Sequence, residues 1–181
     1  MKTHVLRTAN LLIGLWLCLV VISTAEASDA IKSAGDILQY ALPTVAVVPI
    51  ITHKDKKGVL QYAESMGLNL AVTYTLKYAV NESRPNGVSQ SFPSAHTSVS
   101  FTAAEFMRKR YGWEYGIPAY AVASFVAYSR VESREHAPHD VVAGAAIGIL
   151  SSYIFTKPYK GWQVQAEGDS KYLGIRLSRS W

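Results

Sequence analysis

The sequence is poor in cysteine, and its one cysteine lies close to the N-terminus. Cys18 is the single cysteine among 181 residues, so no disulfide can form within the chain. A disulfide framework, which stabilises many small exported proteins, is therefore excluded, and the fold must rest on its core. A chain of this length can bury such a core as one domain.

Long runs of basic residues are also lacking. Lysine and arginine exceed aspartate and glutamate by 18 to 13, which gives a formal net charge of +5. This mild excess suits an anionic ligand or an anionic membrane surface. Because there is neither a basic tract nor an interleaved aromatic platform, nucleic acid is not predicted as a partner.

The first 27 residues have the pattern of a secretory signal peptide. Lys2 and Arg7 precede an apolar run over residues 11–22, and Ala25 and Ala27 supply the small residues that a signal peptidase reads. We therefore expect cleavage after Ala27, export to a bacterial periplasm, and a single mature domain over residues 28–181. An uncleaved anchor is the alternative, although the apolar run is shorter than the roughly 20 residues of a membrane span.

Uninterrupted apolar stretches in the remainder are short. The longest covers residues 141–155 and includes two serines, and others lie at 41–51, 71–76 and 117–128. Each falls short of a full membrane span. This predicts buried core helices of a compact protein and leaves a peripheral or partly embedded membrane protein open.

Helical periodicity and loop signals predict an all-α fold. We expect a compact bundle of about five or six helices, with prominent helices near residues 31–42, 59–81, 94–110, 117–128 and 138–155. In the second of these, Leu60, Leu68, Leu76 and Val80 supply much of the apolar face. Residues 84–93, with two prolines and a glycine, predict a loop. The alternating tail over residues 162–181 predicts a short β-hairpin, either a stabilising flap or an element that faces substrate or membrane.

Two clusters of polar residues flank the predicted loop. Lys77 and Arg84 are seven residues apart, close to two helical turns, and would lie on one face. Ser94, in the run PSAH, is placed as a helix N-cap, with His96 two residues later. Backbone N–H groups at a helix start, together with a hydroxyl and an imidazole, can bind an anion.

The third cluster is SRVESREHAPHD, residues 129–140. Pro138 fits the first position of a helix, with Ala137 as its cap and Asp140 in its first turn. His136 then lies just outside the helix start, where Asp140 can orient one ring nitrogen and leave the other free. Arg130 ends the preceding helix.

Together, the clusters read K-x6-RP, PS-x-H and SR-x5-H-x3-D, and this combination resembles the type 2 phosphatidic acid phosphatase (PAP2) superfamily. That group includes bacterial acid phosphatases, lipid phosphate phosphatases and vanadium haloperoxidases. The likeness runs from Lys77 to Asp140 and continues as D-V-x-x-G-x-x-x-G to Gly148, where glycines allow close packing. The second motif usually reads PSGH, and here Ala95 replaces the glycine, a change that is tolerated if the local φ is negative.

The resemblance implies a metal-independent phosphatase without a cofactor. His136 would attack phosphorus and form a phosphohistidine, with Asp140 orienting it, and His96 would protonate the leaving oxygen. The phosphate would be bound by Lys77, Arg84, Ser94, Ala95 and Arg130. His139 is interpreted as a bystander, and Glu132, Arg134 and Glu135 as solvated loop charges.

The motifs do not specify the substrate. A membrane lipid phosphate is one candidate: phosphatidic acid, phosphatidylglycerophosphate, polyprenyl diphosphate or lipid A. A broad-specificity soluble acid phosphatase is almost equally favoured. A vanadate-dependent haloperoxidase remains as a second enzyme class. A non-catalytic phosphate- or metal-binding module built on His96, His136, His139 and Asp140 is the further alternative.

Overall fold

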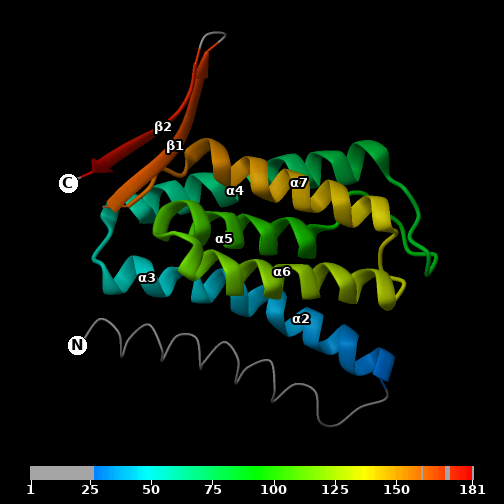
Figure 1. Ribbon diagram of the computed structural model, residues 1–181. Coiled ribbons are helices and arrows are strands. Elements are labelled where there is room, and N and C mark those ends of the chain that lie inside the picture. Colours follow the sequence, from blue (N-terminus) through cyan, green and yellow to red (C-terminus); the bar gives the residue numbers. More distant parts are fainter. Residues whose placement is uncertain (1–26, 160, 170–171, 181) are drawn as a thin grey trace.

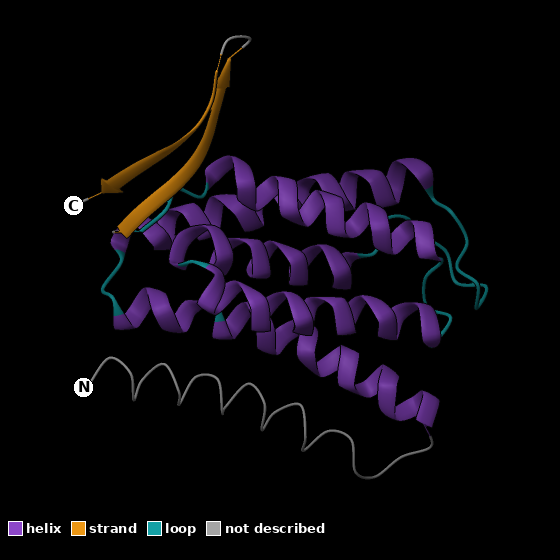
Figure 2. Ribbon diagram, in the orientation of Figure 1, coloured by secondary structure: helices purple, strands orange, loops and turns teal. Residues whose placement is uncertain are grey.

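The computed structural model describes residues 27–159, 161–169 and 172–180. Six helices lie in this part of the chain: α2 (Ala27–Val45), α3 (Val47–Thr52), α4 (Lys56–Val80), α5 (Ala95–Tyr111), α6 (Trp113–Glu132) and α7 (Pro138–Phe155). They lie roughly side by side as a bundle (Figures 1 and 2). The predicted all-α fold is confirmed. The predicted signal peptide falls almost wholly on residues 1–26, outside the described residues.

Strands β1 (Gly161–Asp169) and β2 (Tyr172–Ser180) follow the bundle and pair antiparallel, with Gly161 opposite Ser180 and Asp169 opposite Tyr172. This is the expected hairpin, one residue earlier at its start. It projects away from the helical body in Figure 1.

Local signals in the sequence account for the helix boundaries. The Asp55 side chain caps α4 by accepting a hydrogen bond from Gly58 N at 2.9 Å. Ser94 caps α5, and Ala137 caps α7 with Pro138 at the first helical position. Asn81 ends α4 in the left-handed conformation, with φ of 48°. The caps Asn81, Ser94 and Ala137 lie beside the three sequence clusters, so they fix the candidate site residues at helix ends.

Helix α5 is the centre of the bundle and packs against α2, α4, α6 and α7. Its contact with α7 depends on two glycines of the DVxxGxxxG run. A Cβ atom added to Gly144 would lie 2.6 Å from Ser94 O, and one added to Gly148 would lie 2.3 Å from Ser98 O. No larger residue fits at either position, so the glycines allow the close packing of α7 against α5 that the sequence led us to expect.

Helix α4 is oriented differently from the prediction. Its buried side chains are polar, namely Ser65, Asn69, Thr73 and Lys77, which recur every fourth residue and form one stripe. The residues predicted to form its apolar core face include Leu60, which is 61% exposed, and Val80, which is 48% exposed. Leu68 and Leu76 are half-buried, so the predicted apolar face is not the most buried face of this helix.

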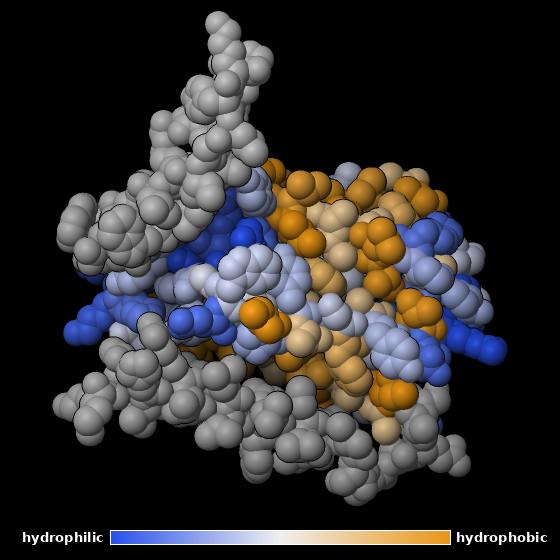
Figure 3. Space-filling model, in the orientation of Figure 1, coloured by the Kyte–Doolittle hydropathy of each residue, from blue (hydrophilic) through white to orange (hydrophobic). Residues whose placement is uncertain are grey.

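Apolar side chains also cover much of the outer surface of the bundle. Large exposed hydrophobic residues lie on α2, α3, α4, α6 and α7, among them Ile51, Ile117 and Val142. In Figure 3 hydrophobic residues gather across the middle of the helical body, with hydrophilic residues at both of its ends. The residues that line the helix contacts are instead mostly small or polar.

Two helical segments are long and apolar enough to cross a membrane by length and composition. They are Asp29–Thr52 and Pro138–Phe155, and only 39% and 33% of their most apolar windows are buried. Most of each window is therefore exposed rather than buried in a core, which agrees with the partly embedded alternative. Such an exterior is unusual for a protein surrounded by water.

Candidate active site

The three clusters meet at one end of the bundle, where α4 and α6 end and α5 and α7 begin (right in Figure 1). His136 lies in the turn between α6 and α7, and its backbone N–H donates to Arg130 O at 3.1 Å. His136 Nδ1 faces Asp140 Oδ2 at 3.3 Å, and both side chains are almost completely buried. The Nδ1 contact leaves Nε2 as the ring nitrogen available for attack on an electrophile.

Asp140 Oδ2 is held by two further contacts. It accepts hydrogen bonds from Ser91 Oγ at 2.5 Å and from the Ala137 backbone N–H at 2.9 Å. Ser91 Oγ also lies 3.4 Å from His136 Nδ1. The sequence analysis missed Ser91, because a serine in a loop of serines and prolines carries no signal of its own. This network fixes the carboxylate and, through it, the imidazole.

Lys77 and Arg84 supply positive charge beside His136. Lys77 Nζ is buried and donates to Gln90 O at 2.7 Å and Ser91 O at 3.2 Å, which are backbone oxygens of the following loop. Arg84 Nη1 donates to Glu135 Oε2 at 2.9 Å. Its Nε is buried and has no hydrogen-bond partner within the described residues. An unpaired guanidinium donor at this place can bind an anion.

The start of α5 is tied directly to the start of α7. The Ser94 backbone N–H donates to Asp140 O at 3.0 Å, and its hydroxyl accepts from Thr97 N at 3.4 Å. Ala95 is the first residue of α5 and does not have a positive φ. The alanine that replaces the usual glycine is therefore accommodated without backbone strain.

Arg130 and His96 share a carboxylate that the sequence analysis did not identify. Asp36, on α2, accepts a hydrogen bond from Arg130 Nη1 at 2.6 Å and lies 3.3 Å from His96 Nε2. Arg130 is buried, and its Nη2 donates to the backbone oxygen of Lys32 at 2.8 Å. Gly35 allows this approach, because a Cβ atom there would lie 1.9 Å from Ser129 Oγ. Asp36 lies more than 40 residues before the first motif and has no pattern to mark it.

Glu135 is an active-site carboxylate rather than a solvated loop charge. Its side chain is 14% exposed and forms ion pairs with Arg84 and with Lys32. Burial alone would raise the pKa of Glu135, but the hydrogen bonds and charges of these two cations outweigh it and hold the pKa below its usual range. The interpretation of this residue from the sequence was wrong, because a loop position gave no hint of the facing α2.

The two histidines are held neutral by their surroundings. Burial, followed by the charges of Lys77 and Arg84, lowers the pKa of His136 to about 4 against the opposing effect of Asp140. Burial, followed by the charge of Arg130, lowers the pKa of His96 to about 4 although Asp36 acts to raise it. Burial and Arg84 lower the pKa of Lys77 to about 8. A neutral His136 at physiological pH is a competent nucleophile.

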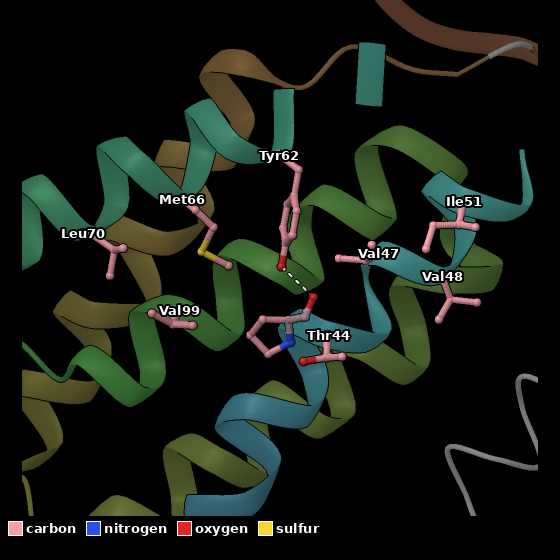
Figure 4. Close-up of a pocket in the computed structure, with 9 residues that line it drawn as sticks. Thr44, Val47, Val48, Ile51, Tyr62, Met66, Leu70 and Val99 are labelled. Carbon is pink, nitrogen blue, oxygen red and sulfur yellow. Dashed lines mark hydrogen bonds between the residues drawn. The ribbon is translucent and has the colours of Figure 1, made fainter. Parts of the chain in front are cut away.

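An apolar groove begins one to two helical turns from Lys77, His96 and Asp36 along their helices. Its volume is about 600 Å³, and it is lined by Pro43, Thr44, Val47, Val48, Ile51, Tyr62, Met66, Leu70 and Val99. Figure 4 shows Met66 and Leu70 of α4 facing this space opposite Thr44 and Val47, with Tyr62 donating to Pro43 O at 3.0 Å. The same helices that carry Asp36, Lys77 and His96 therefore line the groove further along the bundle.

Comparisons with known proteins place the fold and the motifs in one family. The PAP2 superfamily matches residues 58–162. The lipid A 4'-phosphatase of Helicobacter pylori is 28% identical over 86% of this chain and 88% of its own. A lipid A 1-phosphatase of Porphyromonas gingivalis is 35% identical over 67% of this chain but only 31% of its own length. The crystal structure of Aquifex aeolicus LpxE has 21% identity and a TM-score of 0.60, covering 77% of this chain and 92% of that one.

The chain belongs to the PAP2 superfamily, because the family match covers more than half of its length. It is a phosphatase, and so a hydrolase. The family match begins at residue 58, so Lys32 and Asp36 lie outside it.

Proposed function

We propose that this protein removes a phosphate group from a membrane lipid through a phosphohistidine intermediate, and that a lipid A-type phosphoglycolipid is its substrate. The observation that carries the proposal is the position of the buried His136–Asp140 pair and its cations at the end of a bundle whose exterior is apolar. The names of the two relatives support lipid A as the substrate.

The proposed reaction is the one that the family resemblance implies, and the contacts in the site support it. His136 Nε2 attacks phosphorus, and the bond from phosphorus to the lipid oxygen breaks. The protonated form of His96 gives a proton to that oxygen, and Asp140 stabilises the positive charge that develops on His136. His96 then takes a proton from water, which attacks the phosphohistidine and releases inorganic phosphate. Lys77, Arg84 and Arg130, with the hydroxyl of Ser94 and the N–H of Ala95, bind the phosphoryl oxygens and stabilise their charge.

Asp36 and Glu135 complete this arrangement. Each predicted catalytic histidine has a carboxylate 3.3 Å from one ring nitrogen: Asp140 beside His136 and Asp36 beside His96. We assign Asp36 a positioning role, in which it favours the protonated form of His96 and holds Arg130. Glu135 holds Arg84 in the same way.

The lipid part of the substrate has a suitable surface in the apolar groove. Leu70 and Pro43 lie seven residues from Lys77 and Asp36 on their helices, which is about two turns or 10 Å. An acyl chain attached to a head group in the site spans that distance easily. Helix α4 buries polar side chains and exposes apolar ones, which also supports contact with lipid, because a polar interior with an apolar exterior is stable in a membrane. These features favour contact with a membrane over the soluble acid phosphatase.

The test compares the wild type with His136→Asn on lipid A, phosphatidic acid and p-nitrophenyl phosphate in detergent. We expect hydrolysis by the wild type, fastest on lipid A, and complete loss in the variant. Rapid acid-free quenching with radiolabelled substrate should trap an acid-labile phosphoenzyme in the wild type alone. Full activity of His136→Asn would contradict the mechanism, whereas a preference for phosphatidic acid would contradict only the substrate.

A further inference from the structure

A second cluster of potential ligand atoms lies on the outer side of Asp140. Glu82, His139 and Asp140 each offer one atom, and the three atoms lie within 4.8 Å of one another. His139 Nε2 lies 2.9 Å from Glu82 Oε1 and 3.3 Å from Asp140 Oδ1. His139 contacts neither His136 nor His96 in any interaction described above. Of the four residues that the sequence suggested for a metal site, only His139 and Asp140 belong to this cluster, and Glu82 was not among the four.

One atom of this cluster lacks an adequate partner. Asp140 Oδ1 is buried and accepts no hydrogen bond from the described residues, whereas Oδ2 of the same carboxylate accepts two and faces His136. His139 Nε2 lies 3.3 Å from it, but that nitrogen lies closer to Glu82 Oε1, at 2.9 Å. A buried carboxylate oxygen without a partner is costly, and its lone pairs require a donor or a cation.

The two distances from His139 Nε2 to the carboxylate oxygens fit a coordinated metal ion. Zinc binds histidine nitrogen and carboxylate oxygen at about 2.0–2.2 Å, so ligand atoms 2.9 and 3.3 Å apart would subtend roughly 90° and 105° at the ion. One nitrogen and two oxygens suit a borderline transition-metal ion better than Mg²⁺, which prefers oxygen ligands and water. Two carboxylates would offset the charge of the ion, and the exposed His139 and Glu82 leave a path from solvent.

We propose that a divalent transition-metal ion, with Zn²⁺ as the test ion, binds to Glu82, His139 and Asp140 and inhibits the phosphatase. The inhibitory part rests on the proposed function. The ion on Oδ1 withdraws negative charge from the carboxylate whose Oδ2 faces His136 Nδ1. The imidazole then loses support for the positive charge that it acquires on attacking phosphorus, and the phosphohistidine forms more slowly.

The experiment measures binding and inhibition separately. Zinc binding to the full chain in detergent is measured by isothermal titration calorimetry without substrate, which needs no activity. Zinc and magnesium are then titrated into the p-nitrophenyl phosphate assay. The variants are His139→Ala and Glu82→Gln, with His53→Ala as a control that removes an imidazole at the opposite end of the bundle.

We expect one zinc ion per wild-type chain, inhibition by zinc but not by magnesium, and normal basal activity in His139→Ala. Even outer partners of a metal change its affinity about 10- to 100-fold, so losing His139 should raise the half-inhibitory zinc concentration at least as much. Absence of stoichiometric zinc binding, or equal inhibition of the wild type and His139→Ala, would overturn the site. Site-specific binding that leaves turnover unchanged would overturn the inhibitory role. An inactive wild type that binds zinc would contradict the proposed function alone.

Discussion

Replacing Asp36 by asparagine tests whether α2 takes part in the reaction. Asparagine keeps the size of the side chain and an oxygen that accepts from Arg130 Nη1, so the buried guanidinium retains a partner. The substitution removes the negative charge 3.3 Å from His96 Nε2. It therefore separates the charge of Asp36 from its packing.

The size of the effect follows from the distance and the exposure. Two unit charges 3.3 Å apart attract each other by roughly 1.3 kcal/mol in water and 5 kcal/mol at an effective dielectric constant of 20. Because the Asp36 side chain is 42% exposed and that of His96 is 28% exposed, the value lies near the lower end, at about 1–2 kcal/mol. The pKa of His96 should then fall by roughly one unit, which lowers the protonated fraction about tenfold above the pKa.

The assay is the pH dependence of kcat and KM on p-nitrophenyl phosphate. Asp36→Asn should lower kcat by about tenfold at neutral pH and shift the profile to lower pH. KM should not rise, because the lost group is an anion near an anionic substrate. Asp36→Glu should restore part of kcat, and Asp29→Asn, on the exposed start of α2, is the matched control. An unchanged pH profile in Asp36→Asn would refute the assigned role.

Three other perturbations follow from the same contacts. Leu70→Trp, which fills part of the groove, should raise the KM for lipid A several-fold and leave the hydrolysis of p-nitrophenyl phosphate unchanged. The control Leu60→Trp, outside the groove, should change neither. Equal effects of Leu70→Trp on both substrates would argue against the groove as a lipid site. Gly148→Val should destabilise the fold by about 3 kcal/mol or more, because the added atoms meet Ser98 O, whereas Gly67→Ala, with open space around it, should raise the Tm slightly. Thermal unfolding in detergent measures both, and an unchanged Tm in Gly148→Val would contradict the close packing of α7 against α5. The pKa of His96 and of His136 is lowered from 6.5 to about 4 on folding, so between these values the unfolded chain binds more protons than the folded chain. The free energy of unfolding, measured with a chelator present, should therefore fall as the pH falls from 6.5 to 4, by up to about 3 kcal/mol for the buried His136. The variant His136→Gln should show a smaller dependence of this free energy on pH.

The parts of the site that the sequence could predict share a local cause. Ser94 and Pro138 begin helices by their own chemistry, and Asp140 follows Pro138 by two residues, so its position beside His136 is set within one helical turn. Asp36 and Glu135 could not be found in this way. Their roles exist only because α2 packs against the end of α6, which is a contact between residues about 95 positions apart.

Helix α4 shows a different reason for a failed prediction. Its leucines were assigned to the core on the assumption that water surrounds the protein, which makes the apolar face the buried one. The structure instead buries Ser65, Asn69, Thr73 and Lys77, and Thr73 Oγ1 donates to Ser98 Oγ at 3.1 Å across to α5. The periodicity gave the correct helix, but which face turns inward depends on the solvent. A lipid surrounding reverses that choice.

The proposed contact with a membrane also gives a reason why glycines govern the geometry of the site. Where apolar side chains face lipid, helices associate through close packing and polar contacts rather than through burial of apolar surface. Gly144 and Gly148 bring α7 close enough for Ser94 N to reach Asp140 O, and Gly35 brings α2 close enough for Asp36 to reach Arg130. Gly35 thus lets α2 bring Asp36 to Arg130 and His96, whereas Gly144 and Gly148 set where α7, with Asp140 in its first turn, packs against α5. Substitutions at Gly35 should therefore impair phosphate chemistry even where the chain still folds, because a displaced Asp36 leaves His96 without its carboxylate.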